Sequence, residues 1–600
     1  MKRGLTIRSS ILGLLMVLVS NLGDPYTLTE LHSSFLAFDY LPLGLIFPFT
    51  VIVVGNILLK AIHSEWGLHP QELLIVFVMG MIGSVIPTIL IARLIGTIAA
   101  PYYFSTPENQ WASYFHRYIP IWITPSDEHR AMQWFFEGLP KGESIPWGAW
   151  VVPLFWWFSF IAAFSWVCFC TVALLQKQWI ERERVTFPLV RIPLDMIAGS
   201  DERSFLPPCM QKRLFWVGFS LSFSIILWNI IGYFSPFFPR IQLGGGSLEI
   251  ARGFPAISTT IDLRILGLAF LIPLNISLSI WFFALLSAVQ VGIYNRLGFT
   301  IGPGDVYCDS DASMGWESFG AYIFMVLWGL WMARGHLREV VRIAWRGDRE
   351  QEGLLTYRVA LVGFIVGLVY MIGWLAHSGM TWNVITLFLF ATFILHVGAA
   401  RIVAETGLIS FRGPVIPQPF VMYTMGSKVI SGASMASLAF SYSHILTVKN
   451  VFMPVAIQVP KLMEAISVRR HEILLAIGIA AVVGIGVSTW YLLTEGYERG
   501  AYNFGFAFFD TQAMIPFDNI VSKMKNPFGP HVGTWSFLGI GMTLMAILTY
   551  LHYKLTWWPL HPIGLVVSSV SYVWGTALTI FLAWAAKSLI VRLGGIGLYQ

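Results

Sequence analysis

Long runs of apolar residues recur along the whole chain, and polar residues gather in the short stretches between them. A helix needs about 20 apolar residues to cross the hydrocarbon core of a bilayer. The apolar runs lie near residues 11–19, 41–60, 73–99, 148–176, 214–235, 263–293, 317–333, 358–377, 382–400, 431–447, 472–494, 533–552, 557–575 and 576–591. The pattern predicts an all-α, polytopic transmembrane helical bundle of about 12 to 16 spans.

Counting these crossings produces two conflicts with the charges of the loops. Basic residues at the start of the chain place the N-terminus inside, and the count then places the basic loop 177–213 inside as well. The same count places residues 334–357 outside, although four arginines follow one another there at helical spacing. It also places the Lys- and Arg-containing stretch 449–470 outside. At least two of the apolar runs are therefore not simple crossings.

Two runs are the best candidates for interrupted helices. The run 263–293 is long for one span and contains Pro273 and Asn275, so we expect two shorter pieces there. The run 431–447 is rich in Gly and Ser and only weakly apolar, so we expect it to be broken or re-entrant. Interrupted hydrophobic segments are a pointer to the binding site of a membrane transporter.

Composition agrees with a membrane protein and removes other classes. Of 600 residues, 56% are hydrophobic and 12% are charged, against about 25% charged residues in soluble domains. The net charge of +6 resides in short loops, which favours lipid bilayer over nucleic acid as the partner. Lys587 and Arg592 favour an inside C-terminus, so we expect a multi-pass protein of the cell inner (plasma) membrane with both termini cytoplasmic. The four cysteines imply no disulfide framework, and a homo-oligomer is left open.

The stretch from 390 to 419 carries the strongest functional signal. His396, Arg401 and Glu405 follow one another on an apolar helix, and ionisable residues next to a membrane span are functional candidates by default. Because Arg401 and Glu405 are four residues apart, they share one helix face and can pair. In the functional hypothesis, Glu405 binds a proton or a solute amine, and Arg401 holds that charge or a solute carboxylate. The alternative is an ion pair that anchors a helix end at the cytoplasmic interface.

The residues around this pair complete the predicted site for substrate or proton coupling. Thr406 follows Glu405, and Gly407, Gly413 and Pro414 then break the helix. His396 lies nearly opposite Glu405 at 100° per residue, so it is more typical of a packed core histidine than of a relay partner. Further polar candidates in interrupted segments are Asn275 and His444. Further candidates for gating or broken segments are Pro188, Pro193, Asp195 and Pro273.

The 47-residue loop 101–147 offers a second kind of site. His116, Asp127, His129 and Glu137 are candidate acid–base residues, but their spacing matches no zinc motif. Interleaved aromatic residues favour a lid that lies on the membrane surface. A membrane-embedded enzyme acting at the outer face through this loop therefore stays open as an alternative, as does a non-catalytic assembly protein. No ATP-binding or nucleophile-elbow motif occurs, and we expect no catalytic residues, metal or cofactor.

Several segments resemble the oligopeptide transporter superfamily. They are LTIRSSILGLLMVLVSNLG (5–23), HPQELLIVFVMGMIG (69–83), KQWIERERVTFPLVRIPLDMI (177–197), ARIVAETGLISFRGP (400–414) and AIQVPKLMEAISVRRHEILLAIG (456–478). The resemblance extends over roughly 70% of the chain, and loop 101–147 instead resembles an uncharacterised family of large bacterial membrane proteins that would be a divergent branch.

This resemblance implies a bundle in two inverted halves, divided here as 1–300 with the outer loop 101–147, and 301–600 with the broken segment 401–447. It also implies a secondary active transporter that moves a small peptide-like or metal-chelate solute with protons.

Overall fold

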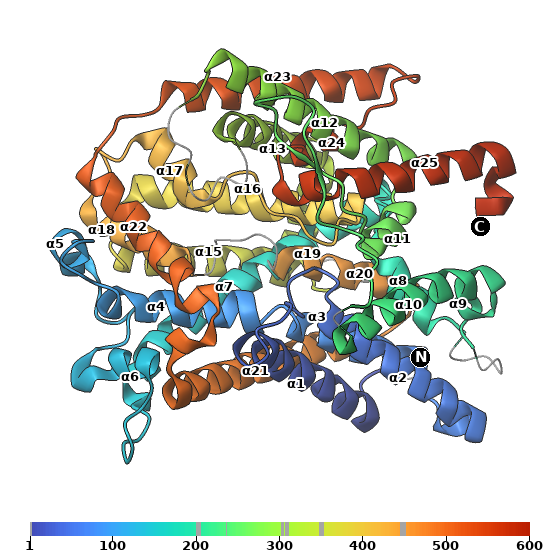
Figure 1. Cartoon of the computed structure of the whole chain (residues 1–600), viewed down its shortest axis with the longest axis horizontal. Helices are drawn as coiled ribbons and strands as arrows, with labels where there is room; N and C mark the ends of the chain where they lie inside the picture. The colour runs from blue at the N-terminus through green and yellow to red at the C-terminus, as the bar shows by residue number, and fades with distance from the viewer. Residues whose placement is uncertain are drawn as a thin grey trace.

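The computed structural model describes residues 3–199, 206–235, 237–301, 305, 311–346, 353–443 and 452–599, and most of these residues are helical. In this part of the chain, the only strands are β1 (Ser247–Leu248) and β2 (Ile257–Ser258), which pair antiparallel. Eleven helical runs are long and apolar enough to cross a membrane. The protein is therefore an all-α, multi-pass membrane protein, as predicted (Figure 1).

The longer helices form the body of the bundle. They are α1 (Ile7–Thr29), α2 (Leu43–Ile62), α3 (Pro70–Gly83), α4 (Arg93–Tyr103), α7 (Trp147–Lys177), α10 (Arg213–Phe234), α12 (Leu274–Leu297), α13 (Ala312–Met332), α14 (Arg334–Arg346), α15 (Tyr357–His377), α16 (Trp382–Thr406), α21 (Arg470–Glu495), α22 (Thr511–Lys525), α23 (Val532–Lys554) and α25 (Ser571–Tyr599).

Shorter helices fill the gaps between them and connect their ends. They are α5 (Trp111–Tyr114), α6 (Ala131–Glu137), α8 (Pro188–Ile197), α9 (Pro208–Gln211), α11 (Leu263–Leu271), α17 (Pro417–Met425), α18 (Gly432–Ser441), α19 (Phe452–Ala456), α20 (Gln458–Ala465) and α24 (Ile563–Val567). Three π-helical segments extend longer helices: η2 (Pro87–Ala92) follows α3, η5 (Gln178–Arg182) extends α7, and η7 (Gly496–Gly500) extends α21.

The predicted break in the run 263–293 is confirmed. Helix α11 ends at Leu271, and α12 begins at Leu274 with Pro273 as its N-cap. Lys587 of α25 is buried there and donates to the carbonyls of Phe270 and Ile272 at 2.9 and 2.7 Å. This lysine therefore caps the free carbonyls of α11, instead of marking a cytoplasmic helix end as its position near the C-terminus suggested.

The predicted break after α16 is also confirmed. Residues 407–416 have no helical structure, and all of them except Arg412 are buried. The extended backbone is held by its neighbours, because the carbonyl of Ile409 accepts from the backbone N–H of Tyr40 at 2.7 Å. Irregular backbone of this kind is tolerated in a membrane protein only where protein or water satisfies it. Helices α17 and α18 that follow have nine and ten residues, too short to cross a bilayer.

The last two predicted spans are arranged differently from the apolar pattern. The run 557–575 contains the five-residue helix α24 and the first residues of α25, which begins at Ser571, and the run 576–591 lies inside α25. Pro559 and Pro562 flank His561 before α24, so a continuous helix cannot form through this stretch. An interrupted segment thus replaces one predicted span.

Basic segments far apart in the sequence meet at one end of the bundle. Glu472 accepts from the backbone N–H of Gly4 at 2.8 Å, and Arg182 pairs with Glu339 at 2.5 Å. We call the end formed by residues 3–8, 177–184, 334–346 and 469–471 the basic end. Residues 334–346 and 469–470, which are described parts of the two stretches whose crossing count conflicted with their charge, lie here, beside residues 3–8 and the end of α7. Because an interrupted run is not a simple crossing, the breaks after α11 and α16 change the count on which those conflicts rested.

Loop 101–147 lies at the opposite end of the bundle, where Figure 1 shows α5 and α6 on the left, away from both chain ends. Trp111 is fully buried and donates through Nε1 to Asp518 at 2.8 Å, and the Phe115 ring stacks on Phe517. These two rings, predicted to lie on the membrane surface, instead fasten the loop to α22. The apolar surface of these two rings is therefore buried against other parts of the protein.

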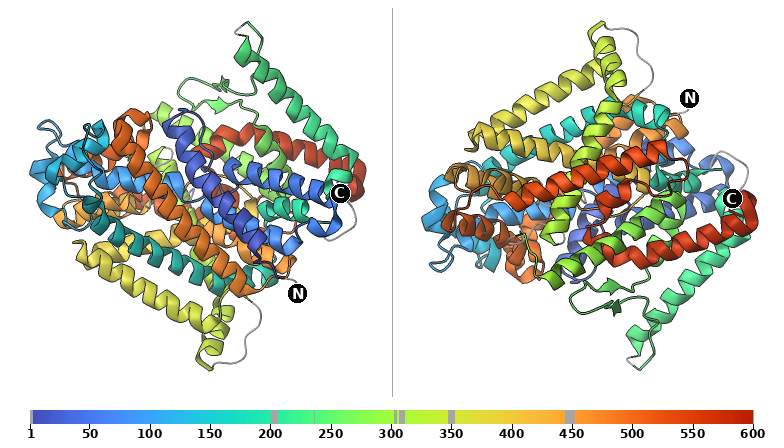
Figure 2. Two further views of the ribbon diagram at one scale, coloured as in Figure 1. Left: turned by 90° about the horizontal axis from the view of Figure 1, so that it is seen from below. Right: turned by 90° about the horizontal axis from the view of Figure 1, so that it is seen from above.

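Helix α10 stands outside the bundle. Figure 2 shows it projecting from the body of the protein, and its spanning window has no buried residue. Leu214, Val217 and Leu221 are all more than 60% exposed. The length and apolar surface of α10 are suited to contact with the hydrocarbon core of a bilayer.

Candidate functional site

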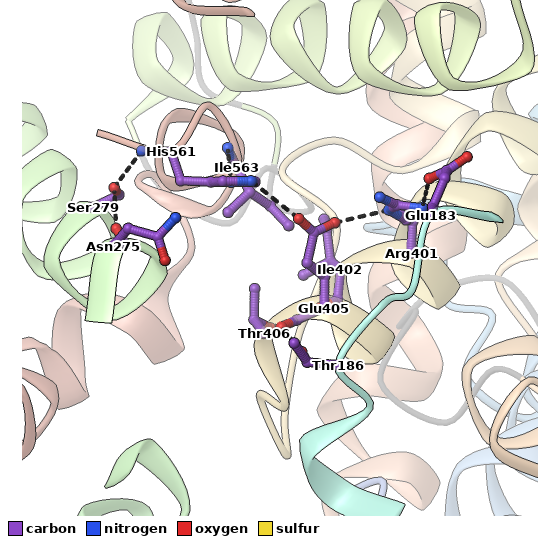
Figure 3. Close-up of polar contacts among 10 residues, drawn as sticks. All are labelled: Glu183, Thr186, Asn275, Ser279, Arg401, Ile402, Glu405, Thr406, His561 and Ile563. Carbon is purple, nitrogen blue, oxygen red and sulfur yellow. Dashed lines mark hydrogen bonds and ion pairs between the residues drawn. The ribbon is translucent and has the colours of Figure 1, made fainter. Parts of the chain in front are cut away.

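Four ionisable side chains form a connected chain at the basic end (Figure 3). The guanidinium of Arg401 donates through Nε to Glu405 at 2.8 Å and through a terminal nitrogen to Glu183. The other oxygen of Glu405 lies 3.1 Å from Nε2 of His561. The predicted Arg401–Glu405 pair is thus confirmed as a contact, and it belongs to a larger cluster from three separate segments.

The last turn of α16 sets the position of Arg401 and Glu405. Thr406 is buried, donates to the carbonyl of Ile402 at 2.8 Å and accepts from the N–H of Leu408, so it closes the helix end and contacts no charged group. Gly407 has φ of +66°, a conformation that favours glycine. A Cβ on Gly407 would lie 2.6 Å from Pro188, so α8 packs directly against the helix end.

Glu183 is brought to this helix end by the segment between η5 and α8. The backbone N–H of Phe187 donates to the carbonyl of Ala404 at 2.9 Å, and the hydroxyl of Thr186 donates to the carbonyl of Glu405 at 3.1 Å. These bonds satisfy carbonyls that the end of an α-helix leaves free. Segment 183–188 therefore caps α16 and delivers the second carboxylate to Arg401.

His561 is held on the other side by the interrupted segment before α24. Its backbone N–H donates to the hydroxyl of Ser279 at 2.6 Å, and that hydroxyl donates to the carbonyl of Asn275 at 2.6 Å. Its Nδ1 accepts from the backbone N–H of Ile563 at 3.3 Å. Asn275 thus contributes to the site through its backbone only, at the start of α12.

A cavity of about 390 Å³ adjoins the cluster. The titratable residues of its lining include Glu183, Arg401, Glu405, His552 and His561, and Trp179, Trp328 and Tyr553 supply aromatic surface. The guanidinium of Arg401 lies 5.6 Å from the centre of the Trp179 ring. One guanidinium faces two carboxylates here, so the lining carries one negative charge in excess when both histidines are neutral. Such a cavity can hold a solute with a cationic group beside Glu183 and an anionic group beside Arg401.

His396 takes no part in this arrangement. It is buried, its Nδ1–H donates to the carbonyl of Thr392 at 2.6 Å, and its ring contacts Phe164 edge-on. The expectation that it faces away from Glu405 agrees with these contacts. It is a packed histidine of the α16 interior.

The remaining predicted residues lie in three places. Pro188 begins α8 against Gly407, whereas Pro193 is buried inside that helix. Asp195 is exposed on α8, and its carbonyl accepts from the Cys209 thiol. It does not line this cavity, and it does not line a second, larger cavity at the basic end. Gly413 and Pro414 belong to the buried irregular segment, and His444 lies outside the described residues.

The candidate acid–base residues of loop 101–147 contact separate partners. Nε2–H of His116 donates to the carbonyl of Pro101 at 2.9 Å, and burial lowers the pKa of this histidine. Asp127 accepts from the N–H of Met132, and Glu137 accepts from Gln133. The side chain of His129 lies outside the described part. The convergence that the enzyme hypothesis requires is absent among the three described side chains.

The sequence alone did not identify Glu183, His552 or His561. Glu183 stands among alternating charges in Glu-Arg-Glu-Arg (181–184), which is typical of a solvated loop. His561 stands between two prolines inside an apolar run, and that interruption was the available signal.

The chain was compared with known families and proteins. All of its residues, 1–600, match a family described as "Family of unknown function (DUF6785)". The chain belongs to this family. A search of curated proteins found no match. Membership in DUF6785 assigns no activity.

Proposed function

We propose that this DUF6785 protein is a secondary active transporter of a small peptide-like or metal-chelate solute, coupled to protons. The observation that supports it best is the cluster of Arg401, Glu405, Glu183 and His561 beside a 390 Å³ cavity. The cluster joins the ends of interrupted segments, and such breaks are where transporters place their solute and ion sites. The resemblance to the oligopeptide transporter superfamily and the two inverted halves remain part of this proposal.

In this mechanism, Arg401 binds the carboxylate of the solute, and Glu183 with Glu405 binds its amine or the cationic part of a chelate. The basic end faces the cytoplasm of the cell, since basic loops remain on that side of the inner membrane. Both termini are then cytoplasmic, and the cavity belongs to an inward-facing arrangement. Loop 101–147 closes the outer end.

Uptake by purified protein in proteoliposomes tests this function. We expect accumulation of labelled members of a di- and tripeptide library, or of a metal-chelate set, when an inward proton gradient is imposed. Arg401→Ala and Glu405→Gln should lower uptake on the order of tenfold or more, because each removes a charge-assisted hydrogen bond worth about 1.5–3 kcal/mol. Glu464→Gln is the matched control, since Glu464 also forms a helical ion pair, with Lys461 at 2.6 Å, away from the cluster. Uptake that is equal in all four proteins, or absent for every solute, contradicts the proposal.

A further inference from the structure

The hydrogen bonds of His561 determine which of its ring nitrogens carries the proton. Nδ1 accepts from the backbone N–H of Ile563, so it has no hydrogen in this arrangement. Nε2 lies 3.1 Å from Glu405, and an unprotonated nitrogen there would face a carboxylate oxygen without a hydrogen between them. These two ring contacts (Figure 3) fit the neutral tautomer with its hydrogen on Nε2.

Charged and titratable groups face His561 from two helices. From α16 it meets Glu405, with Arg401 and Glu183 beyond that carboxylate. From α23 it meets the ring of His552, whose centre lies 4.8 Å away, and Tyr553 lines the same cavity. Helix α12 supplies the uncharged Ser279, and α13 supplies the uncharged side of the cavity at Trp328 and Gly329.

Nδ1 of His561 cannot carry a proton and at the same time accept a hydrogen bond from the backbone N–H of Ile563. A proton on Nδ1 turns that nitrogen into a donor, and it can no longer accept from Ile563. The imidazolium at the same time forms an ion pair with Glu405, in which both partners are charged and which is stronger than the bond from a neutral imidazole to that carboxylate. The added charge thus stabilises the contact with α16 and removes the contact with the first residue of α24.

Helix α24 is well placed to transmit this change. It packs against α12, where Gly564 lies so close to the carbonyl of Ser279 that a Cβ would approach it to 2.6 Å. Ser318 of α13 donates to the carbonyl of Leu565 at 3.5 Å. Pro562 and Ile563 belong to the cavity lining. A shift at the start of α24 therefore changes the cavity itself.

We propose that His561 is the residue that binds the coupling proton, and that protonation at Nδ1 releases the first turn of α24. This inference rests on the proposed transport function and assigns the proton to His561 instead of Glu405. Because the imidazolium also neutralises part of the charge of Glu405, Arg401 is freed to bind the carboxylate of the solute. Proton and solute then bind together, as coupled transport requires.

Hydrogen exchange of the whole protein in detergent, followed by mass spectrometry, tests the proton site without a solute. We expect amides of 563–568, corrected for intrinsic rates, to exchange roughly fivefold faster at pH 5.5 than at pH 8, the effect of losing one helix N-terminal cap. His561→Gln keeps a donor for Glu405 but does not titrate, so this acid response should vanish. His561→Asn, which can keep an acceptor for Ile563, should remove it as well.

The chain offers a matched control in His531, whose Nδ1 accepts from the N–H of Thr534 at the start of α23. His531→Asn should leave the acid response of α24 intact. An acid response that persists in both His561 variants, or that is absent from the wild type, overturns the proposal.

Uptake measurements separate this inference from the proposed function. Proton-driven uptake that keeps its full pH dependence in His561→Gln but loses it in Glu405→Gln contradicts the role of His561 and leaves the transporter intact. A wild type that transports nothing contradicts the proposed function, and hydrogen exchange still decides whether His561 binds the proton.

Discussion

Two clusters of oppositely charged side chains in this protein lie in different surroundings. At the basic end, Arg401 bridges Glu183 and Glu405, and these three side chains are 23%, 26% and 14% exposed. Elsewhere, Lys523 of α22 pairs with Asp305 at 2.5 Å, and these side chains are 9% and 0% exposed. Asn519 accepts a further bond from the ammonium at 2.5 Å.

The two clusters differ in their access to solvent and in the balance of their positive and negative charges. Among the described residues, Lys523 and Asp305 match one charge with one charge in a buried site, an arrangement that holds two segments together. The Arg401 cluster opens on a cavity, carries an excess carboxylate and lies beside the ends of interrupted helices. Burial of charge alone therefore does not support the proposed transport site, and the proposal depends on the unbalanced charge beside a cavity.

The largest expected effect is on the stability of the buried pair. Asp305→Asn leaves the Lys523 ammonium buried without its counter-charge, which costs about 3–5 kcal/mol. Glu405→Gln should cost clearly less, because water in the cavity can reach the cluster. Thermal unfolding in detergent measures both, and the double variant Asp305→Asn/Lys523→Met should recover part of the loss. Equal losses for Asp305→Asn and Glu405→Gln would remove the distinction between the two clusters.

The next effect concerns transport instead of stability. Arg401→Lys keeps the charge but loses the planar fork that reaches Glu183 and Glu405 together. We expect proteoliposome uptake to fall by about tenfold to a hundredfold, the loss of one or two charge-assisted bonds, with little change in the unfolding temperature. The exposed Arg182, which pairs with Glu339, provides the control Arg182→Lys with unchanged uptake. A normal rate for Arg401→Lys means that Arg401 serves only as a point charge.

The sequence predicted the part of this comparison that depends on neighbouring residues. Spacing of four residues placed Arg401 beside Glu405, and Gly407 with Pro414 predicted the break that follows. Pro273 predicted the interruption between α11 and α12, and the conflicts between charge and crossing count indicated that the apolar runs included broken helices. Each of these signals is local, because propensity and periodicity act within a few residues.

The parts that the sequence did not predict depend on contacts between distant segments. Glu183 reaches Arg401 because Arg184 and Phe187 adopt positive φ, at 52° and 46°, which side-chain preferences do not indicate. His561 reaches Glu405 because Ser279, 282 positions earlier, holds its backbone. Lys587 lies beneath a helix end although its sequence position is typical of a membrane-interface anchor.

A smaller effect tests the helix end that positions the open cluster. Gly407→Ala places a side chain in the left-handed region and directs it at Pro188, which should cost about 1–3 kcal/mol and displace Glu405. Gly373→Ala in α15 is the control, because a Cβ there meets nothing within 4 Å and alanine favours a helix. Thermal unfolding and uptake should both fall for Gly407→Ala alone. An unaffected Gly407→Ala protein would show that Pro188 can move away from the added side chain without displacing Glu405.

The smallest expected effect is the acid response of His336, which distinguishes this histidine of the basic end from His561. His336 of α14 is buried and donates through Nε2 to the carbonyl of Leu174 at 2.9 Å, and burial lowers its pKa although this bond opposes the shift. Above the usual histidine pKa of about 6.5 the folded and unfolded chains are both neutral at this site. Below it the unfolded chain binds the proton more readily, so the free energy of unfolding falls as the pH is lowered.

Hydrogen exchange of α14 should therefore accelerate slightly on acidification, and His336→Gln, which keeps the donor to Leu174, should remove this response. Because His336 contacts none of Arg401, Glu405 or Glu183, its acid response should persist unchanged in His561→Gln. If His561→Gln removed both responses, a single acid-sensitive rearrangement of the basic end would replace two independent histidines, and the sites around α14 and α24 would have to be treated as one.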